Sequence, residues 1–155
     1  MSGGSFNYLY IVDPLDLPQR MEDLGAMQKT LAGLGYADDV AEATQAVIDK
    51  IKEVTAKFNE GRHPWEDGLE AARCKRADLE DITDRDADDE AEYQQLQRDL
   101  DAAERAIGEL SSPLYWIWKG VEWWHSCDDS EDTFKKTLDE WRKPATRETT
   151  NGGVE

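Results

Sequence analysis

Apolar residues recur at three- and four-residue steps along most of this chain, which is the spacing of one buried face on an α-helix. The first stretch with this spacing carries Leu17, Met21, Leu24 and Leu31. Pro18 suits the first position of a helix, where its missing N–H costs nothing, and glycine is common just past a helix end. The pattern therefore predicts a first helix from Pro18 to about Gly33.

A second helix is predicted from the helical spacing of Val40, Val47, Ile51, Val54 and Phe58. Asp38 or Asp39 can cap its amino terminus, because a carboxylate oxygen there accepts hydrogen bonds from unpaired backbone amides. The helix should end near Gly61, since glycine favours the backbone conformation that stops a helix.

Residues 65–110 are predicted to form two helices or one long bent helix. Helical spacing is weak from Trp65 to about Ile82 and clearer from Ala91 to Leu110. The segment between them, residues 83–90, reads Thr-Asp-Arg-Asp-Ala-Asp-Asp-Glu. It is too acidic and too poor in apolar residues for a buried element, which favours the exposed tip of a helical hairpin.

An aromatic-rich helix is predicted after the hairpin, with Ser112 as its cap and Pro113 at its first position. It carries Tyr115, Trp116, Trp118, Trp123 and Trp124. No single helical face can hold all five rings, so some must be exposed or must contact the amino-terminal aromatic residues.

The last helix is expected to end at Pro144, after the helically spaced Phe134, Leu138 and Trp141. Helical spacing and apolar neighbours place Trp116, Trp124 and Trp141 in the core. Residues 145–155 are polar, which predicts a disordered tail. We therefore expect an all-α fold: one helical bundle over residues 1–144, in which residues 65–110 form an acidic extension that protrudes as a helical hairpin.

The chain of 155 residues carries 35 acidic and 18 basic side chains, a formal net charge of −17 at pH 7. This excess repels nucleic acid and anionic lipid, so direct binding to either is not expected. The longest apolar run, residues 114–121, is shorter than the roughly 20 residues that a membrane span needs. The two cysteines, Cys74 and Cys127, make no disulfide framework, which favours a reducing cytoplasm.

Motifs for metal binding and catalysis are incomplete. Asp84, Asp86 and Asp88 imitate the start of an EF-hand loop, but Asp89 replaces its glycine and Gln95 replaces its bidentate glutamate. The histidines and cysteines do not fall in a zinc-ligand spacing, and no phosphate-binding loop or nucleophile motif occurs. We therefore predict a non-enzymatic protein without a metal or cofactor.

The acidic residues are concentrated in one place. Residues 78–101 contain eleven acidic side chains against Arg85 and Arg98, a local net charge of −9. Duplex DNA presents one charge per about 1.7 Å of axis, so a helical rod studded with carboxylates can occupy a site built for nucleic acid. Acidity for solubility alone is the alternative. The predicted partner-binding residues are Asp78, Glu80, Asp81, Asp84, Asp86, Asp88, Asp89, Glu90 and Glu92, with Trp65 as an aromatic anchor.

Both ends of the chain carry a recognisable motif. Residues 2–8 read Ser-Gly-Gly-Ser-Phe-Asn-Tyr, and residues 122–132 read Glu-Trp-Trp-His-Ser-Cys-Asp-Asp-Ser-Glu-Asp. This combination resembles a family of small proteins from actinobacterial genomes and tailed phages, for which no activity is established. The family has glycines where Cys127 and Ser130 stand. The resemblance implies that the two segments pack together through a structural motif of Gly3, Gly4, Phe6, Tyr8, Glu122, Trp123, Trp124 and Asp128.

The resemblance covers residues 1–60 and 113–142, which makes the acidic stretch an insertion. A phage or prophage origin implies interference with a host machine, by analogy with small acidic phage proteins that block restriction or CRISPR complexes. We therefore expect an inhibitor in the host bacterial cytoplasm that binds a basic surface of such a complex as a DNA mimic.

Two alternatives stay open. One is a protein that sequesters a nucleotide signal, in this case as a homo-oligomer, with its aromatic side chains and the backbone amides of Gly3 and Gly4. It needs local positive charge, for which Arg73, Lys75 and Arg76 form the tightest basic cluster. The other is a structural or regulatory protein whose acidity is incidental.

Overall fold

The fold consists of helices. The computed structural model describes residues 6, 8–63, 65–126 and 130–143, and no strand occurs among them. Within these residues the α-helices are α1 (Met21–Gly33), α2 (Asp38–Asn59), α3 (Gly68–Glu80), α4 (Ala87–Ser111), α5 (Tyr115–His125) and α6 (Glu131–Arg142). Short 3-10 segments are η1 (Leu9–Ile11), η2 (Pro14–Arg20) and η3 (Ser112–Leu114). The expected all-α fold is confirmed.

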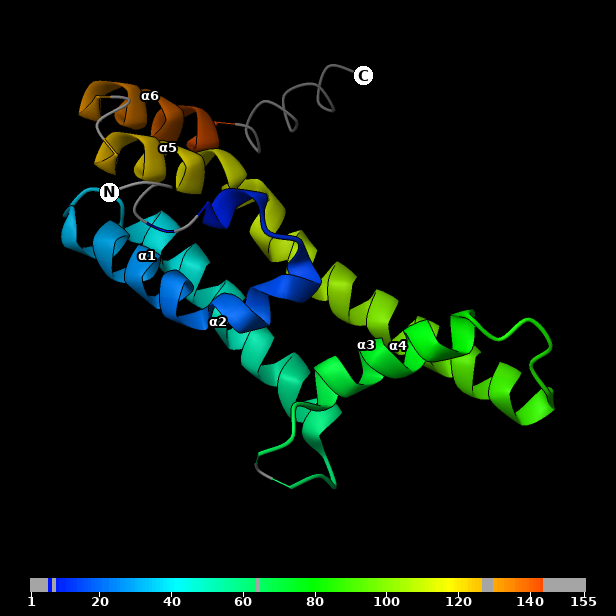
Figure 1. The fold of residues 1–155 in the computed structure, drawn as a ribbon. Helices are drawn as coiled ribbons and strands as arrows, with labels where there is room; N and C mark the ends of the chain where they lie inside the picture. The colour runs from blue at the N-terminus through cyan, green and yellow to red at the C-terminus, as the bar shows by residue number, and fades with distance from the viewer. Residues whose placement is uncertain (1–5, 7, 64, 127–129, 144–155) are drawn as a thin grey trace, which may run out of the picture.

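Two helix pairs build the body of the molecule: α1 lies along α2, and α5 lies along α6 (Figure 1). Their apolar faces meet in one core, where burial of each large apolar side chain contributes about 1.5–3 kcal/mol. The core includes Leu24, Met27, Leu31, Val47, Ile51, Ile117, Val121, Phe134 and Leu138. None of the described helices is long and apolar enough to cross a membrane.

The first α-helix begins at Met21, so the predicted start at Pro18 is wrong. The preceding residues form the 3-10 segment η2 instead. Arg20 has φ of −118° and ψ of 28°, outside the α-helical region, and this break separates η2 from α1. Leu17 of η2 is nevertheless buried in the core, as its spacing predicts.

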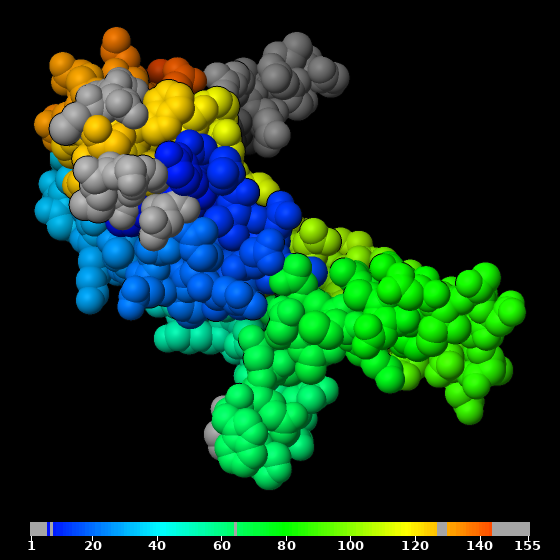
Figure 2. Space-filling model, in the orientation of Figure 1, coloured from blue at the N-terminus to red at the C-terminus, as the bar shows by residue number. Residues whose placement is uncertain are grey.

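Helices α3 and α4 form a hairpin that projects from the body (Figures 1 and 2). The hairpin turn lies in the predicted place, but residues 87–90 already belong to α4. They are helical because Asp86 Oδ1 accepts the backbone N–H of Asp89 at 2.7 Å and so caps the helix. The other half of α4 lies in the body, where Leu100, Ala103 and Ile107 are part of the core. The projecting part is therefore shorter than residues 65–110.

Helices α4 and α5 are joined by η3 alone, so residues 87–125 form an almost continuous helical run. The prediction that Ser112 caps a new helix is wrong, because Ser112 lies inside η3. Its backbone N–H donates to the carbonyl of Gly108 in the last turn of α4, so no free helix start needs a cap. Pro113 lies in the first turn of η3, where its missing N–H costs no hydrogen bond.

The tryptophans of α5 divide between core and surface. Trp118 is buried and donates its indole N–H to Thr44 Oγ1 at 3.1 Å. Trp124 and the α6 residue Trp141 are partly buried against the core, in keeping with the prediction. Trp116 is 62% exposed, so its predicted place in the core is wrong. Residues two positions apart on an α-helix point in nearly opposite directions, and the inward position belongs to Trp118.

Candidate functional site

The acidic residues singled out by the sequence lie in the last turn of α3, in the hairpin turn and in the first turns of α4. We call these nine side chains the acidic tip. Asp89 and Glu90 are partly buried. The exposed members are Asp78, Glu80, Asp81, Asp84, Asp86, Asp88 and Glu92. The structure thus brings together, mostly facing solvent, all the carboxylates that the sequence predicts as a partner-binding set.

Few carboxylates of the acidic tip are neutralised within the protein. Glu90 Oε1 lies 2.7 Å from Arg85 Nε, and Glu92 Oε1 lies 3.9 Å from Lys75 Nζ. Within the described residues, the other seven carboxylates form no ion pair. On an exposed helix, acids are commonly paired with lysines three or four residues away. Seven acids of the tip have no such partner among the described residues, so negative potential is concentrated there.

Arg85 lies within the acidic tip, but it is used to hold the turn together. Its Nη1 donates to the carbonyl of Leu79 at 2.8 Å, and its Nε donates to Glu90 at 2.7 Å. Its guanidinium also lies 4.4 Å from the ring centre of Tyr93, a cation–π contact. The Tyr93 hydroxyl in turn donates to Glu80 at 3.2 Å. These bonds connect α3, the turn and α4 into one defined structure.

The same contacts shift the pKa values of three side chains at the turn, Glu90, Tyr93 and Arg85. Hydrogen bonds from Gln94 and then from Arg85 lower the pKa of Glu90. Partial desolvation, aided by the hydrogen bond to Glu80, raises the pKa of Tyr93, so its hydroxyl keeps its proton. The hydrogen bond to Glu90 raises the pKa of Arg85 above its usual range. The ion pair that closes the turn is therefore fully charged at neutral pH.

Trp65 lies in the loop between α2 and α3, at the base of the hairpin. It is 79% exposed and stacks on His63, with ring centres 4.3 Å apart. The loop is anchored where α3 begins, because Asn59 Oδ1 accepts the Gly68 N–H at 2.7 Å and a Cβ at Gly68 would collide with the Phe58 carbonyl oxygen. An exposed, already stacked indole loses little side-chain entropy on binding and suits a contact with another protein.

The described residues of the two terminal motifs meet at Glu122, which is 1% exposed. Its Oε2 accepts the backbone N–H of Phe6 at 3.0 Å and that of Tyr8 at 3.2 Å. Tyr8 has a left-handed backbone conformation, with φ of 59°. Backbone amides that converge in this way form a concave anion-binding site, here filled by the protein's own carboxylate. The predicted packing of the first segment against the second is present at these residues.

The tryptophans after Glu122 have different surroundings. Trp124 stacks on Phe134 of α6, with ring centres 5.6 Å apart, whereas Trp123 is 39% exposed. The remaining members of the predicted motif, Gly3, Gly4 and Asp128, lie outside the described residues. Those motif residues that the structure describes thus connect the amino-terminal segment, α5 and α6.

The basic cluster that a nucleotide-binding site would need is largely paired with carboxylates. Arg73 Nη1 lies 2.8 Å from Asp16 Oδ1, and Lys75 is the partner of Glu92. Arg76 alone of the three forms no ion pair with the described residues. One such arginine beside several acids offers a bound phosphate little net attraction.

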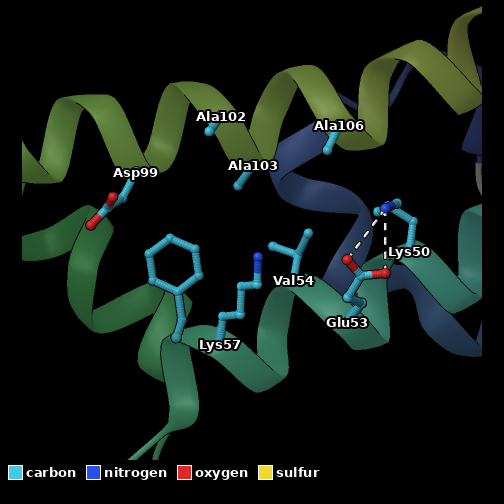
Figure 3. A pocket seen from close by; sticks show the side chains of 9 residues that line it. Lys50, Glu53, Val54, Lys57, Asp99, Ala102, Ala103 and Ala106 are labelled. Atoms are coloured by element: carbon cyan, nitrogen blue, oxygen red, sulfur yellow. Dashed lines mark hydrogen bonds and ion pairs between the residues drawn. The ribbon is translucent and has the colours of Figure 1, made fainter.

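A groove with a volume of about 470 Å³ lies between α2 and α4 (Figure 3). The sequence analysis missed it, although three alanines close together on α4 were a signal that the two helices leave space between them. Its apolar lining consists of Val54, Phe58, Ala102, Ala103 and Ala106. Its polar lining consists of Lys50, Glu53, Lys57 and Asp99, with Lys50 Nζ 3.3 Å from Glu53 Oε1. These charges balance, and the lining holds no serine, cysteine or histidine to act as a nucleophile.

Comparison with known proteins supplies no relative. No protein-family model, curated protein or solved structure matches this chain. In the described part of the chain, no three histidine, cysteine or acidic side chains are grouped so that they could hold a metal ion. The acidic tip and the Trp65 loop at the base of the same hairpin are therefore the features from which a function is inferred.

Proposed function

We propose that this protein is a non-enzymatic inhibitor of phage or prophage origin that binds a host defence complex of the restriction or CRISPR type. It acts as a DNA mimic on a basic surface that normally holds nucleic acid. The observation that carries the proposal is the acidic tip: it projects from the body, and seven of its nine carboxylates have no ion pair within the described residues.

The charge of the acidic tip suits a surface made for phosphates. Duplex DNA carries one charge per about 1.7 Å of its axis, and the tip likewise gathers acids on both sides of the turn, from Asp78 in α3 to Glu92 in α4. Lysines and arginines of a nucleic-acid channel would pair with them as they pair with DNA.

The rigidity of the acidic tip favours binding over mere solubility. A solubilising segment needs charge alone, whereas this turn is fixed by Arg85 and by the Asp86 cap. A group that is already held in position loses less entropy when it binds. The charges would speed encounter and select basic partners, while Trp65 would supply an apolar contact that charge cannot.

The nucleotide-sequestering alternative has less support. It depends on the cluster of Arg73, Lys75 and Arg76, and two of these side chains pair with acids of the same chain. The other alternative, a structural or regulatory protein whose acidity is incidental, would not need a turn with a fixed geometry.

The test is affinity capture from a bacterial lysate at low and high salt, with proteins identified by mass spectrometry. A neutralised variant changes four exposed acids of the tip whose side chains form no hydrogen bond among the described residues: Asp78→Asn, Asp81→Asn, Asp84→Asn and Asp88→Asn. A matched control removes four exposed charges elsewhere: Glu22→Gln, Glu42→Gln, Glu104→Gln and Glu109→Gln. Asp86 and Glu90 are left intact because they hold the turn.

The proposal expects the wild type and the control to capture a nucleic-acid-handling complex that is released by high salt and by added duplex DNA. The neutralised variant should bind that complex about tenfold more weakly or worse. If the neutralised variant captures the complex as well as the wild type does, the proposal that the acidic tip mimics DNA is wrong. No protein partner, with a nucleotide co-purifying instead, would favour the sequestering alternative.

A further inference from the structure

The groove between α2 and α4 has the size and the lining of a site for a small molecule (Figure 3). Its volume of about 470 Å³ lies within the roughly 300–1,000 Å³ of typical ligand pockets. Its apolar lining comes from both helices: Val54 and Phe58 from α2, and Ala102, Ala103 and Ala106 from α4. Alanine side chains are short and leave the space open, so an apolar molecule that enters gains contacts on both walls. The first property of the ligand is therefore an apolar body.

The groove is narrow, elongated along α2 and different at its two ends. Its lining on α2 runs from Lys50 to Phe58, about 12 Å at the rise of about 1.5 Å per residue. At one end Lys50 Nζ lies 3.3 Å from Glu53 Oε1, so the two charges neutralise each other. The other end, at Lys57 and Phe58, is where a charge is left for a ligand.

That charge is the ammonium group of Lys57. Its side chain points from α2 toward α4 (Figure 3), and it forms no ion pair with the described residues. Asp99 stands on the opposite wall, but its Oδ1 accepts the side-chain amide of Gln95 at 2.8 Å. This bond directs the carboxylate along α4 toward Gln95, which does not line the groove. Lys57 thus supplies one positive charge beside apolar walls, which is complementary to a single carboxylate on an apolar body.

We propose that this groove binds a small amphipathic monocarboxylate of the fatty-acid type. The carboxylate pairs with Lys57, and the apolar chain lies along Val54 and Ala103 toward the Lys50–Glu53 pair. The chain displaces water from both helices, while the ion pair fixes its direction. A cationic amphiphile of the same length meets the ammonium group of Lys57 and is rejected. This inference does not depend on the function proposed for the acidic tip.

The test is isothermal titration of the full chain with decanoate, below the concentration at which decanoate forms micelles. The wild type should bind with a Kd between about 10 µM and about 1 mM, as expected for a small ligand in an open groove. Lys57→Gln should raise this Kd about tenfold or more, because it removes the charge that pairs with the carboxylate. Lys52→Gln is the matched control: it removes an exposed lysine of the same helix that does not line the groove.

Two further variants test the walls of the groove. Ala106→Leu fills the space that the apolar chain needs and should weaken binding about tenfold or more, whereas Ala91→Leu makes the same change at an exposed position of α4 outside the groove. Asp99→Asn removes a negative charge near the carboxylate and should strengthen binding a few-fold. Circular dichroism checks that each variant keeps its helices.

Amide chemical shifts in NMR spectra locate the bound molecule. Decanoate should shift the amides of residues 50–58 and 99–106 and leave those of α5 in place. A wild type that binds no decanoate up to about 10 mM would overturn the proposal. So would equal affinity in Lys57→Gln, equal affinity for decyltrimethylammonium, or shifts centred on α5.

Discussion

The buried carboxylate of Glu122 binds the backbone amide of Phe6 at 3.0 Å, across 116 residues of sequence. The same oxygen also accepts the amide of Tyr8. A side chain that is 1% exposed thus satisfies the backbone donors of both Phe6 and Tyr8. Glu122 therefore holds these two residues, and η1 directly after them, against α5.

Replacement of Glu122 should destabilise the protein, and the loss should grow with the number of side-chain oxygens removed from the amides of Phe6 and Tyr8. Glu122→Ala leaves the amides of Phe6 and Tyr8 unpaired and should lower the free energy of unfolding by about 2–4 kcal/mol. Glu122→Gln keeps one acceptor oxygen and should cost about half as much. Urea unfolding followed by tryptophan fluorescence measures both. If the glutamine variant is the less stable of the two, the carboxylate oxygen is not what holds the segment.

Loss of Arg85 should loosen the acidic tip and leave the body intact. Arg85→Ala removes the bonds to Leu79 and Glu90, so backbone amides of residues 81–90 should exchange with deuterium about tenfold faster or more, with little change in α1 and α2. Arg85→Lys keeps the charge without the planar fork that serves both acceptors, and should restore little protection. Full protection in the lysine variant would mean that charge alone closes the turn.

The ion pair between α2 and α6 predicts a pH dependence of stability. Arg142 donates to both carboxylate oxygens of Asp39, at 2.7 and 2.9 Å, and the hydrogen bond lowers the pKa of Asp39 from its ordinary 3.8. A lowered folded-state pKa stabilises the protein above the unfolded value, and this contribution is lost as the pH falls through the folded value.

Asp39→Asn should therefore reduce stability by about 1 kcal/mol or less at pH 7, because the pair is solvent-exposed. The difference from wild type should shrink as the pH falls below 3.8. Thermal unfolding from pH 7 downward checks this, and Arg142→Gln should show the same trend. A deficit independent of pH would assign the effect to packing instead of charge.

Trp65 should matter for binding and not for folding. Its side chain is 79% exposed, so Trp65→Ala should change the free energy of unfolding by no more than about 0.5 kcal/mol. The affinity for a complex captured through the acidic tip should fall about tenfold or more, as for other interface tryptophans. Trp65→Phe keeps a ring and should lie between the two. Unchanged affinity in the alanine variant would remove Trp65 from the contact surface.

Sequence periodicity predicts the helices well because burial in this protein follows one face of each helix. The rows through Val47 and Ile51, or through Phe134 and Leu138, are both periodic and buried. The prediction for Trp116 is wrong because the buried row of η3 and α5 runs through Leu114, Ile117, Trp118 and Val121, which leaves Trp116 on the outer side. The hydrogen bond from Trp118 to Thr44, 74 residues away, is a contact that no local pattern reveals.

The candidate site could be located from the sequence, but its internal order could not. Clustering of acids predicts an exposed turn, since such a segment cannot be buried. The path of the turn in three dimensions decides that Asp86 caps α4, that Glu90 binds Arg85 and that Asp84 forms no ion pair with the part of the chain that is described. The sequence likewise gives no sign that Lys119 gathers rings from η1 and α5.

The helical run from α4 through η3 to α5 sets the distance between the acidic tip and the aromatic residues of α5. Helix α4 has 25 residues, and at about 1.5 Å per residue it is about 38 Å long. One of its ends bears the acidic tip, and the other leads within one 3-10 turn to the row of Trp116, Lys119 and Trp123. A surface bound at the acidic tip would therefore lie about one helix length from the aromatic side chains at the start of α5.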